Sequence, residues 1–252
     1  MMAELPPDAG ASPPPPPEPS PRDPFWGYLD LLIFIGLAIP CMLMGLAVVK
    51  VFLWMFHLHP AVKTWELVPA QFAGYALLFV VLALLFRTQY DRPFWKSLGW
   101  TTPRLPVVWM VVAGMMAAIV VSTVGSMMRI PNQENPLTEL LKDPKSLVLV
   151  AVFGITVGPL CEELAFRGLL QPLLVRSLGP VPGILLASLP FGLLHYQEYG
   201  NSWRHAIVIS LAGAAFGWMR HATGSTKAST IMHAAYNALF FVALFSAKSA
   251  GG

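Results

Sequence analysis

Four polar side chains in the second half of the chain are of types that can activate a water molecule for attack on a carbonyl group. Carboxylates and imidazoles serve as general bases, and an amide N–H can donate a hydrogen bond to an oxyanion. Each of the four lies in a stretch that is otherwise almost wholly apolar. Because a charged side chain near the centre of a bilayer costs roughly 2.5–3.5 kcal/mol on insertion scales, their presence there predicts a functional site. They are Glu162, His195, His233 and Asn237.

Glu162 belongs to a small charged group of its own. Glu163 follows it directly, and Arg167 comes four residues after Glu163. Positions four apart lie on one face of a helix, so Glu163 and Arg167 are predicted to pair and to offset much of each other's burial cost. Glu162 then points about 100° away around the helix, and its carboxylate stays free for other work. We interpret the Glu163–Arg167 pair as structural.

The two histidines show the same spacing. Phe191 precedes His195 by four residues, and His233 precedes Asn237 by four. Three helices would thus each present polar groups on one face, and in a bundle these faces can converge on an interior site. Each residue alone also has a simpler interpretation: a histidine can bond a neighbouring carbonyl, Asn237 can join two helices, and Phe191 can be part of the core. The joint pattern favours a site.

The composition predicts a membrane protein. Of 252 residues, 56% are hydrophobic and 12% are charged, and the mean hydropathy is +0.61. A soluble domain carries about 25% charged residues. The net charge of +3 is mild and no dense basic stripe is present, so we expect membrane lipids and no nucleic acid as partners. Cys41 and Cys161 both lie in apolar runs, which argues against a disulfide framework.

The apolar runs predict an all-α fold, a polytopic transmembrane bundle of about seven helices, within a range of six to eight. The fourth run is too long for one perpendicular span, and Gly158-Pro159 and Pro172 predict that it is tilted, kinked or partly outside the bilayer. The runs are Tyr28 to Val49, Leu67 to Phe86, Val107 to Met128, Leu147 to Val175, Val181 to His195, His205 to Met219 and Ala228 to Ala247.

The domain organisation follows from the same runs. Residues 1–24 are predicted to be a disordered proline-rich tail, residues 25–146 the N-terminal transmembrane helices and loops, and residues 147–247 the helical core that carries the polar groups. The connection from Arg87 to Pro106 is the most basic one, so the positive-inside rule places it and the N-terminus in the cytoplasm. The tail has neither the basic start nor the short apolar run of a signal peptide.

Three of these patterns, in this order, resemble the motifs of the CPBP intramembrane proteases. They are Glu162-Glu163-x-x-x-Arg167, Phe191-x-x-x-His195 and His233-x-x-x-Asn237. The family includes the CAAX prenyl protease 2 enzymes and the bacteriocin-processing and self-immunity (Abi) proteins. The resemblance covers roughly Leu147 to Phe245, and it makes residues 147–247 a CPBP-like catalytic core. It implies an integral membrane protein of the plasma membrane, for which we expect a bacterial source.

The resemblance also implies a role for each motif residue. Glu162 is expected to act as general base on a water held with His195. His233 and Asn237 are expected to stabilise the oxyanion, and Glu163 and Arg167 to position the first glutamate, with Phe191 in support. The implied activity is that of an endopeptidase cleaving membrane-associated proteins or peptides, prenylated CAAX-type proteins among them, near the cytoplasmic membrane face.

The metal requirement is open at this point. Glu162, His195 and His233 form a set of the kind that binds catalytic Zn²⁺. The chain lacks His-Glu-x-x-His, and asparagine is a better oxyanion donor than zinc ligand. The family is described both as metalloproteases and as glutamate-dependent enzymes, and the residues favour the second. The sequence therefore assigns no definite cofactor, and Zn²⁺ is the one candidate cofactor.

Two other functions are compatible with the sequence. A non-catalytic membrane scaffold or self-immunity protein would work without Glu162 and His195. A proton-coupled transporter would use the same two residues as a relay. The chain shows no repeated halves with paired broken helices, which many such transporters have, so the transporter is the weaker alternative.

Overall fold

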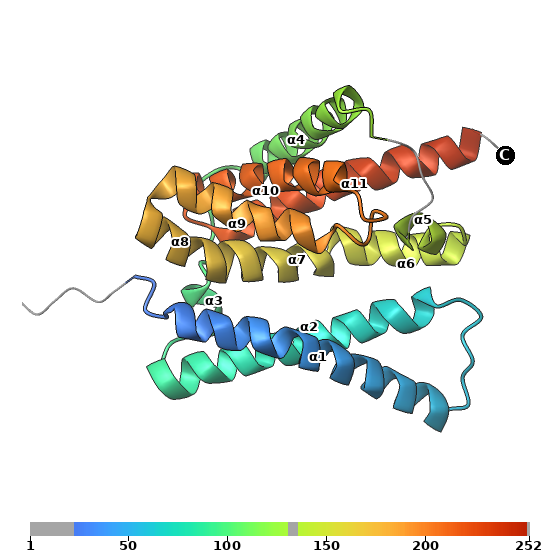
Figure 1. Ribbon diagram of the computed structural model, residues 1–252, viewed down its shortest axis with the longest axis horizontal. Helices are drawn as coiled ribbons and strands as arrows, with labels where there is room; N and C mark the ends of the chain where they lie inside the picture. The colour runs from blue at the N-terminus through green and yellow to red at the C-terminus, as the bar shows by residue number, and fades with distance from the viewer. Residues whose placement is uncertain (1–22, 131–135, 251–252) are drawn as a thin grey trace, which may run out of the picture.

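The computed structural model describes residues 23–130 and 136–250, and the regular elements in these ranges are all helices (Figure 1). Five helices among the described residues are long and apolar enough to cross a membrane, and α9 is apolar but shorter. The all-α polytopic bundle is thus confirmed. Residues 1–22 of the predicted tail lie outside the described residues.

Each of the seven predicted runs corresponds to a helix or a set of helices. The differences lie in the connections: α2 continues through Arg87, and the basic loop after it contains one turn of helix, α3. A short helix, α5, lies in the connection before the fourth run. The elements are α1 (Tyr28–Met55), α2 (Thr64–Tyr90), α3 (Phe94–Ser97), α4 (Val107–Met127), α5 (Pro136–Leu140), α6 (Pro144–Ile155), α7 (Val157–Glu163), the π-helix η1 (Leu164–Leu170), α8 (Gln171–Leu178), α9 (Pro180–Leu194), α10 (Trp203–Thr223) and α11 (Thr226–Ala250).

The helices form two groups. Figure 1 shows α1 and α2 as a crossed pair along one side of the molecule, with the other long helices beside it. In the larger group α9 packs on α10, and α11 packs on both α4 and α10. The continuous run from α6 to α8 lies between the groups, and its α6 contacts α2. This central run carries the paired glutamates, so both groups contribute to what surrounds them.

The central run, predicted to be tilted, kinked or partly outside the bilayer, is interrupted close to Pro159. Thr156 separates α6 from α7 with φ −116° and ψ −80°, outside helical values. Pro159 has no N–H to bond the carbonyl of Ile155, which explains a break at this point. Pro172 likewise cannot bond Gly168, and the turn before it is widened into the π-helix η1. The glutamates therefore end α7 and Arg167 lies in η1.

The segment before α1 is fastened to the central run. Trp26 is 2% exposed, and its indole N–H donates to the carbonyl of Leu169 at 3.1 Å. Arg176 Nη1 donates to the carbonyl of Pro24 at 2.6 Å. These contacts join residues about 145 positions apart in the chain and hold the start of α1 against η1 and α8.

The outer faces of the first helices are apolar. Leu29, Ile39 and Trp54 on α1 are 70%, 71% and 77% exposed. Exposed apolar surface of this extent marks a surface that does not face water. Together with the five spanning-length helices, it identifies an integral membrane protein.

The crossing of α1 and α2 depends on two glycines. A Cβ atom on Gly45 would lie 2.5 Å from the carbonyl oxygen of Ala70 and 2.5 Å from the nitrogen of Gly74. Real Cβ atoms do not approach backbone so closely, so the helix axes can cross here only because Gly45 has no side chain. Small residues have this function in many membrane helix pairs.

We predict that Gly45→Ala lowers the stability of the protein by about 1–3 kcal/mol, because the two backbones must move apart. Gly36→Ala on the same helix is the matched control, since a Cβ there meets nothing within 4 Å. Its melting temperature in mild detergent should be unchanged or slightly higher, as alanine favours helix over glycine. Equal melting temperatures for the two variants would contradict this account of the crossing.

Candidate active site

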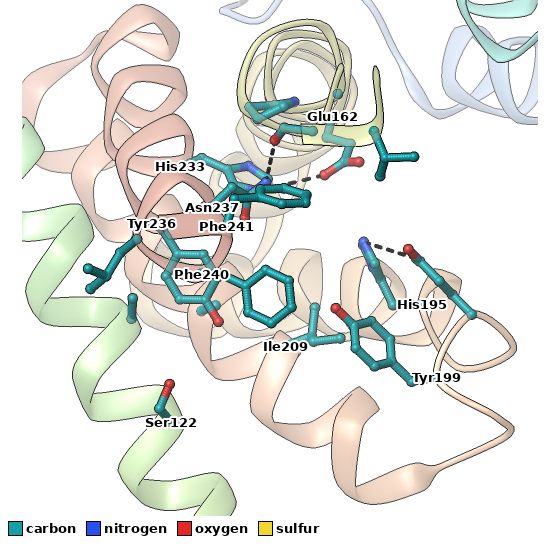
Figure 2. A pocket seen from close by; sticks show the side chains of 18 of the residues that line it. Ser122, Glu162, His195, Tyr199, Ile209, His233, Tyr236, Asn237, Phe240 and Phe241 are labelled. Carbon is teal, nitrogen blue, oxygen red and sulfur yellow. Dashed lines mark hydrogen bonds and ion pairs between the residues drawn. The ribbon is translucent and has the colours of Figure 1, made fainter. Parts of the chain in front are cut away.

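A cavity of about 630 Å³ lies between α2, α4, the central run and α9 to α11. It is lined by all four residues predicted to handle water, and by Phe191 as well. Figure 2 shows the four arranged around one space, contributed by three parts of the chain. The predicted convergence of three polar faces is thus present in the structure. The four residues are Glu162 from α7, His195 from the end of α9, and His233 and Asn237 from α11.

Behind the cavity wall lies the predicted ion pair. Arg167 Nη1 is 2.9 Å from Glu163 Oε1, and the two side chains are 1% and 0% exposed. Arg167 Nη2 also donates to the carbonyl of Gly213 on α10 at 2.7 Å, and its guanidinium carbon lies 4.4 Å from the ring centre of Phe191. A buried ion pair is stable only with such additional partners. The prediction of pairing is confirmed.

His233 connects the ion pair to the cavity. Its Nδ1 donates to Glu163 Oε1 at 3.0 Å, and its Nε2 lies 3.8 Å from Glu162 Oε2. The ring stacks on Phe216 at 4.4 Å between centres. Because Nδ1 carries the proton shared with Glu163, Nε2 is the nitrogen that faces Glu162, and it can donate only when the ring is doubly protonated. Glu163 thus orients His233, a role that same-helix spacing alone does not indicate.

Glu162 differs from its neighbour. Its side chain is 22% exposed to the cavity, and none of the hydrogen bonds among the described residues involves its carboxylate. Arg167 and His233 both contact the Glu163 carboxylate. The Glu162 carboxylate has only the 3.8 Å contact with His233 Nε2. The carboxylate that helix geometry left free in the sequence is free in the structure.

His195 directly follows the last residue of α9 and is its C-cap. Its Nδ1 donates to the carbonyl of Phe191 at 2.9 Å, which leaves Nε2 as an acceptor on the cavity side. Nε2 lies 3.9 Å from Glu198 Oε2, in the turn between α9 and α10. Burial raises the pKa of Glu198, attraction to His195 opposes this shift, and repulsion from Glu162 adds to it.

Glu198 and Tyr199 were missed in the sequence. Both line the cavity, and burial raises the pKa of Tyr199. One sequence feature pointed to them: both lie in the short polar turn directly after His195, a predicted site residue. Since a turn has no fixed periodicity, the sequence does not indicate which of its side chains fold back over the site.

Asn237 bonds to a neighbouring helix and also lines the cavity. Its Nδ2 donates to the carbonyl of Gly154 on α6 at 2.6 Å, so it joins α11 to the central run. The amide nitrogen carries a second hydrogen, and the residue also lines the cavity. The two interpretations of Asn237, as a contact between helices and as a site residue, are therefore compatible.

The possible zinc ligands do not form a metal-binding group. Among the described residues, no three or more His, Cys, Asp or Glu side chains lie close enough together to hold a metal ion. Glu162 approaches His233, but His195 pairs with Glu198 instead. The arrangement shown does not fit a three-ligand zinc site, and we derive no step through a metal.

The cavity lies at one end of the bundle. Its lining includes Gln71 near the start of α2, Ser126 near the end of α4, and Glu198 after α9. Figure 1 shows this end, with α5 and the start of α6, opposite the end where α1 begins. A cytoplasmic N-terminus would thus place this end of the cavity on the other side of the membrane, and the orientation of the chain stays a prediction.

Comparison with known proteins agrees with the motifs. Residues 144–239 match the family model described as Rce1-like, type II CAAX prenyl endopeptidase. CAAX prenyl protease 2 of Caenorhabditis elegans is 33% identical over 98 residues, which cover 33% of this chain and 37% of that protein. The matched segment belongs to the CPBP family. All the motif residues lie within it, and the aligned part spans little more than a third of the relative's length. No solved structure matches the chain.

We predict that residues 23 and 197 lie on opposite sides of the membrane. In a protein whose buried Cys41 and Cys161 are replaced by alanine, Asp23→Cys and Gln197→Cys are labelled separately with a membrane-impermeant maleimide. One should react in intact cells and the other only after permeabilisation. Labelling of both from the same side would contradict the placement of the cavity.

Proposed function

We propose that this chain is an intramembrane endopeptidase that hydrolyses peptide bonds of membrane-associated proteins or peptides. The CPBP family assignment supports a membrane endopeptidase as the general activity. The observation that carries the proposal is the free carboxylate of Glu162, which faces the cavity next to a glutamate whose Oε1 is held by Arg167 and His233. Prenylated CAAX-type proteins are one substrate class within it, and a bacterial plasma membrane is the proposed location.

The proposed chemistry begins with a water in the cavity that binds to Glu162. His195 lines the same cavity, and we propose that its acceptor Nε2 helps to hold this water. Glu162 takes a proton from this water, and the water oxygen forms a bond to the carbonyl carbon of the substrate. The carbonyl oxygen becomes an oxyanion, to which the second N–H of Asn237 and the doubly protonated form of His233 can donate. Glu162 then passes its proton to the leaving amine as the C–N bond breaks.

The remaining wall of the cavity suits an apolar substrate. Ile209, Phe240 and Phe241 line it together with the apolar residues of α4. A mostly apolar pocket with a few convergent polar groups is typical of a substrate site. A lipidated or transmembrane peptide could thus be held by its apolar part while the polar groups act on the peptide bond.

The side of the membrane on which the cavity opens separates two substrate classes. If Gln197 is labelled from the cytoplasm, proteins made and prenylated there can reach the site. If it is labelled from outside, the substrates are exported peptides or the outer ends of membrane proteins. The basic connection from Arg87 to Pro106 predicts a cytoplasmic N-terminus. With that orientation we expect Gln197 to be labelled from outside.

We predict that Glu162→Gln abolishes cleavage of a fluorogenic prenylated peptide while the protein stays folded. The loss should be about 10²–10⁴-fold, as for removal of a general base. Glu66→Gln is the control, since Glu66 lies on α2 in a surface ion pair with Lys50. Full cleavage by Glu162→Gln would contradict the proposal and would favour the scaffold alternative.

Elemental analysis of the same preparation, with cleavage measured with and without a chelator, tests the zinc hypothesis. Cleavage that resists chelation is the result expected for a water activated by glutamate alone. Stoichiometric zinc, with activity lost on chelation and restored by added metal, would instead assign Glu162, His195 and His233 as ligands.

A further inference from the structure

A second cavity, of about 270 Å³, lies at the end of the bundle where α1 begins. The segment before α1, the π-helix η1, α8 and the last turn of α10 form its walls. It shares no residue with the catalytic cavity. Its lining is rich in cationic side chains, contributed by Arg167, Arg176 and Arg220, and His221 also lines it.

We propose that this second cavity binds a phosphate-bearing anion, and that its occupant is the headgroup of an anionic phospholipid. Guanidinium groups match phosphate geometry and charge. Glu163 already balances the charge of Arg167, so Arg176 and Arg220 supply the attraction. Asp23 is the one acid in the lining. It is exposed at the edge of the cavity, so a positive balance remains.

Both outer arginines are held in place before any ligand binds. Arg220 Nε donates to Thr226 Oγ1 at 2.9 Å, and its Nη2 packs against Gly99, where a Cβ atom would collide with it. Gly99 also has φ +72°, which favours glycine. Arg176 is fixed by one bond to the Pro24 carbonyl. Each guanidinium thus keeps further N–H groups for a ligand, and little side-chain entropy is lost on binding.

Gln171 adds a buried polar side chain to the wall of this cavity. Gln171 is 3% exposed, and its Nε2 donates to the carbonyl of Gly217 at 2.9 Å. Its Oε1 is buried and has no hydrogen-bond partner among the described residues. A buried acceptor without a donor costs about 1–3 kcal/mol. Phosphatidylglycerol has the phosphate charge that the arginines of this cavity would bind.

The position of the cavity favours a lipid over a free ion. It lies where membrane-spanning helices begin and end, which is the level of lipid headgroups. The basic connection between α2 and α4, with Arg92, Lys96 and Arg104, leaves the bundle at the same end. Because this cavity shares no lining residue with the first cavity, the proposed lipid site does not depend on the proposed proteolysis.

The test is the melting temperature of the full chain in mild detergent, titrated with phosphatidylglycerol or phosphatidylcholine. Phosphatidylglycerol should raise it and phosphatidylcholine should not. In Arg176→Gln the half-effective phosphatidylglycerol concentration should rise about tenfold, as for one lost charge-assisted hydrogen bond. In His221→Glu it should rise as well, because the added carboxylate repels the phosphate. Arg204→Gln is the matched control, because Arg204 is also exposed and donates Nη1 to a backbone carbonyl, that of Arg129.

Each outcome has a defined meaning. An equal phosphatidylglycerol effect in Arg176→Gln, His221→Glu and the wild type, or equal effects of the two lipids, would overturn the proposal. Inorganic phosphate is added in a parallel titration: an effect at millimolar concentration, lost in the same variants, would replace the lipid by a soluble phosphate as occupant. If Arg176→Gln does not fold, His221→Glu decides, since His221 is exposed and only adds a charge at the edge.

Discussion

The buried ion pair between Glu163 and Arg167 is the interaction on which the site depends. Both charges are almost completely removed from solvent, and such a pair is costly unless every partner is in place. The partners come from separate helices: Gly213 on α10 and His233 on α11. One ion pair therefore ties the central run to the two helices that complete the cavity. It also holds Glu163 Oε1 between Arg167 and His233, whereas Glu162 is the carboxylate that we propose to react.

The central run provides both rigidity and position. Its prolines bend the helix and widen it at η1, so that the charged group lies in a segment packed on both sides. The segment before α1 is attached to this run by the hydrogen bond from Trp26 to the carbonyl of Leu169 in η1. Arg167 lines the basic cavity, and through Glu163 it is connected to His233, which lines the first cavity.

Patterns within a single helix were readable from the sequence. The four-residue spacing placed Glu163 on Arg167 and left Glu162 free, and the prolines predicted the bent fourth run. Contacts between helices could not be predicted, because the spacing of residues within one helix does not show which other helix packs against it. The bond from His233 to Glu163 joins residues 70 positions apart, and Glu198 folds over the site from a turn. The end of the bundle that holds the cavity also emerged only when the helices were placed together.

The most direct test of this account compares the stability of two adjacent substitutions. Glu163→Gln should lower the free energy of unfolding in detergent by about 3–5 kcal/mol, because Arg167 loses its buried partner. Glu162→Gln should leave it nearly unchanged, and so should Asp91→Asn, which breaks an exposed ion pair of the same spacing with Arg87. Equal losses for Glu162→Gln and Glu163→Gln would show that the two glutamates are not divided between a structural and a reactive role.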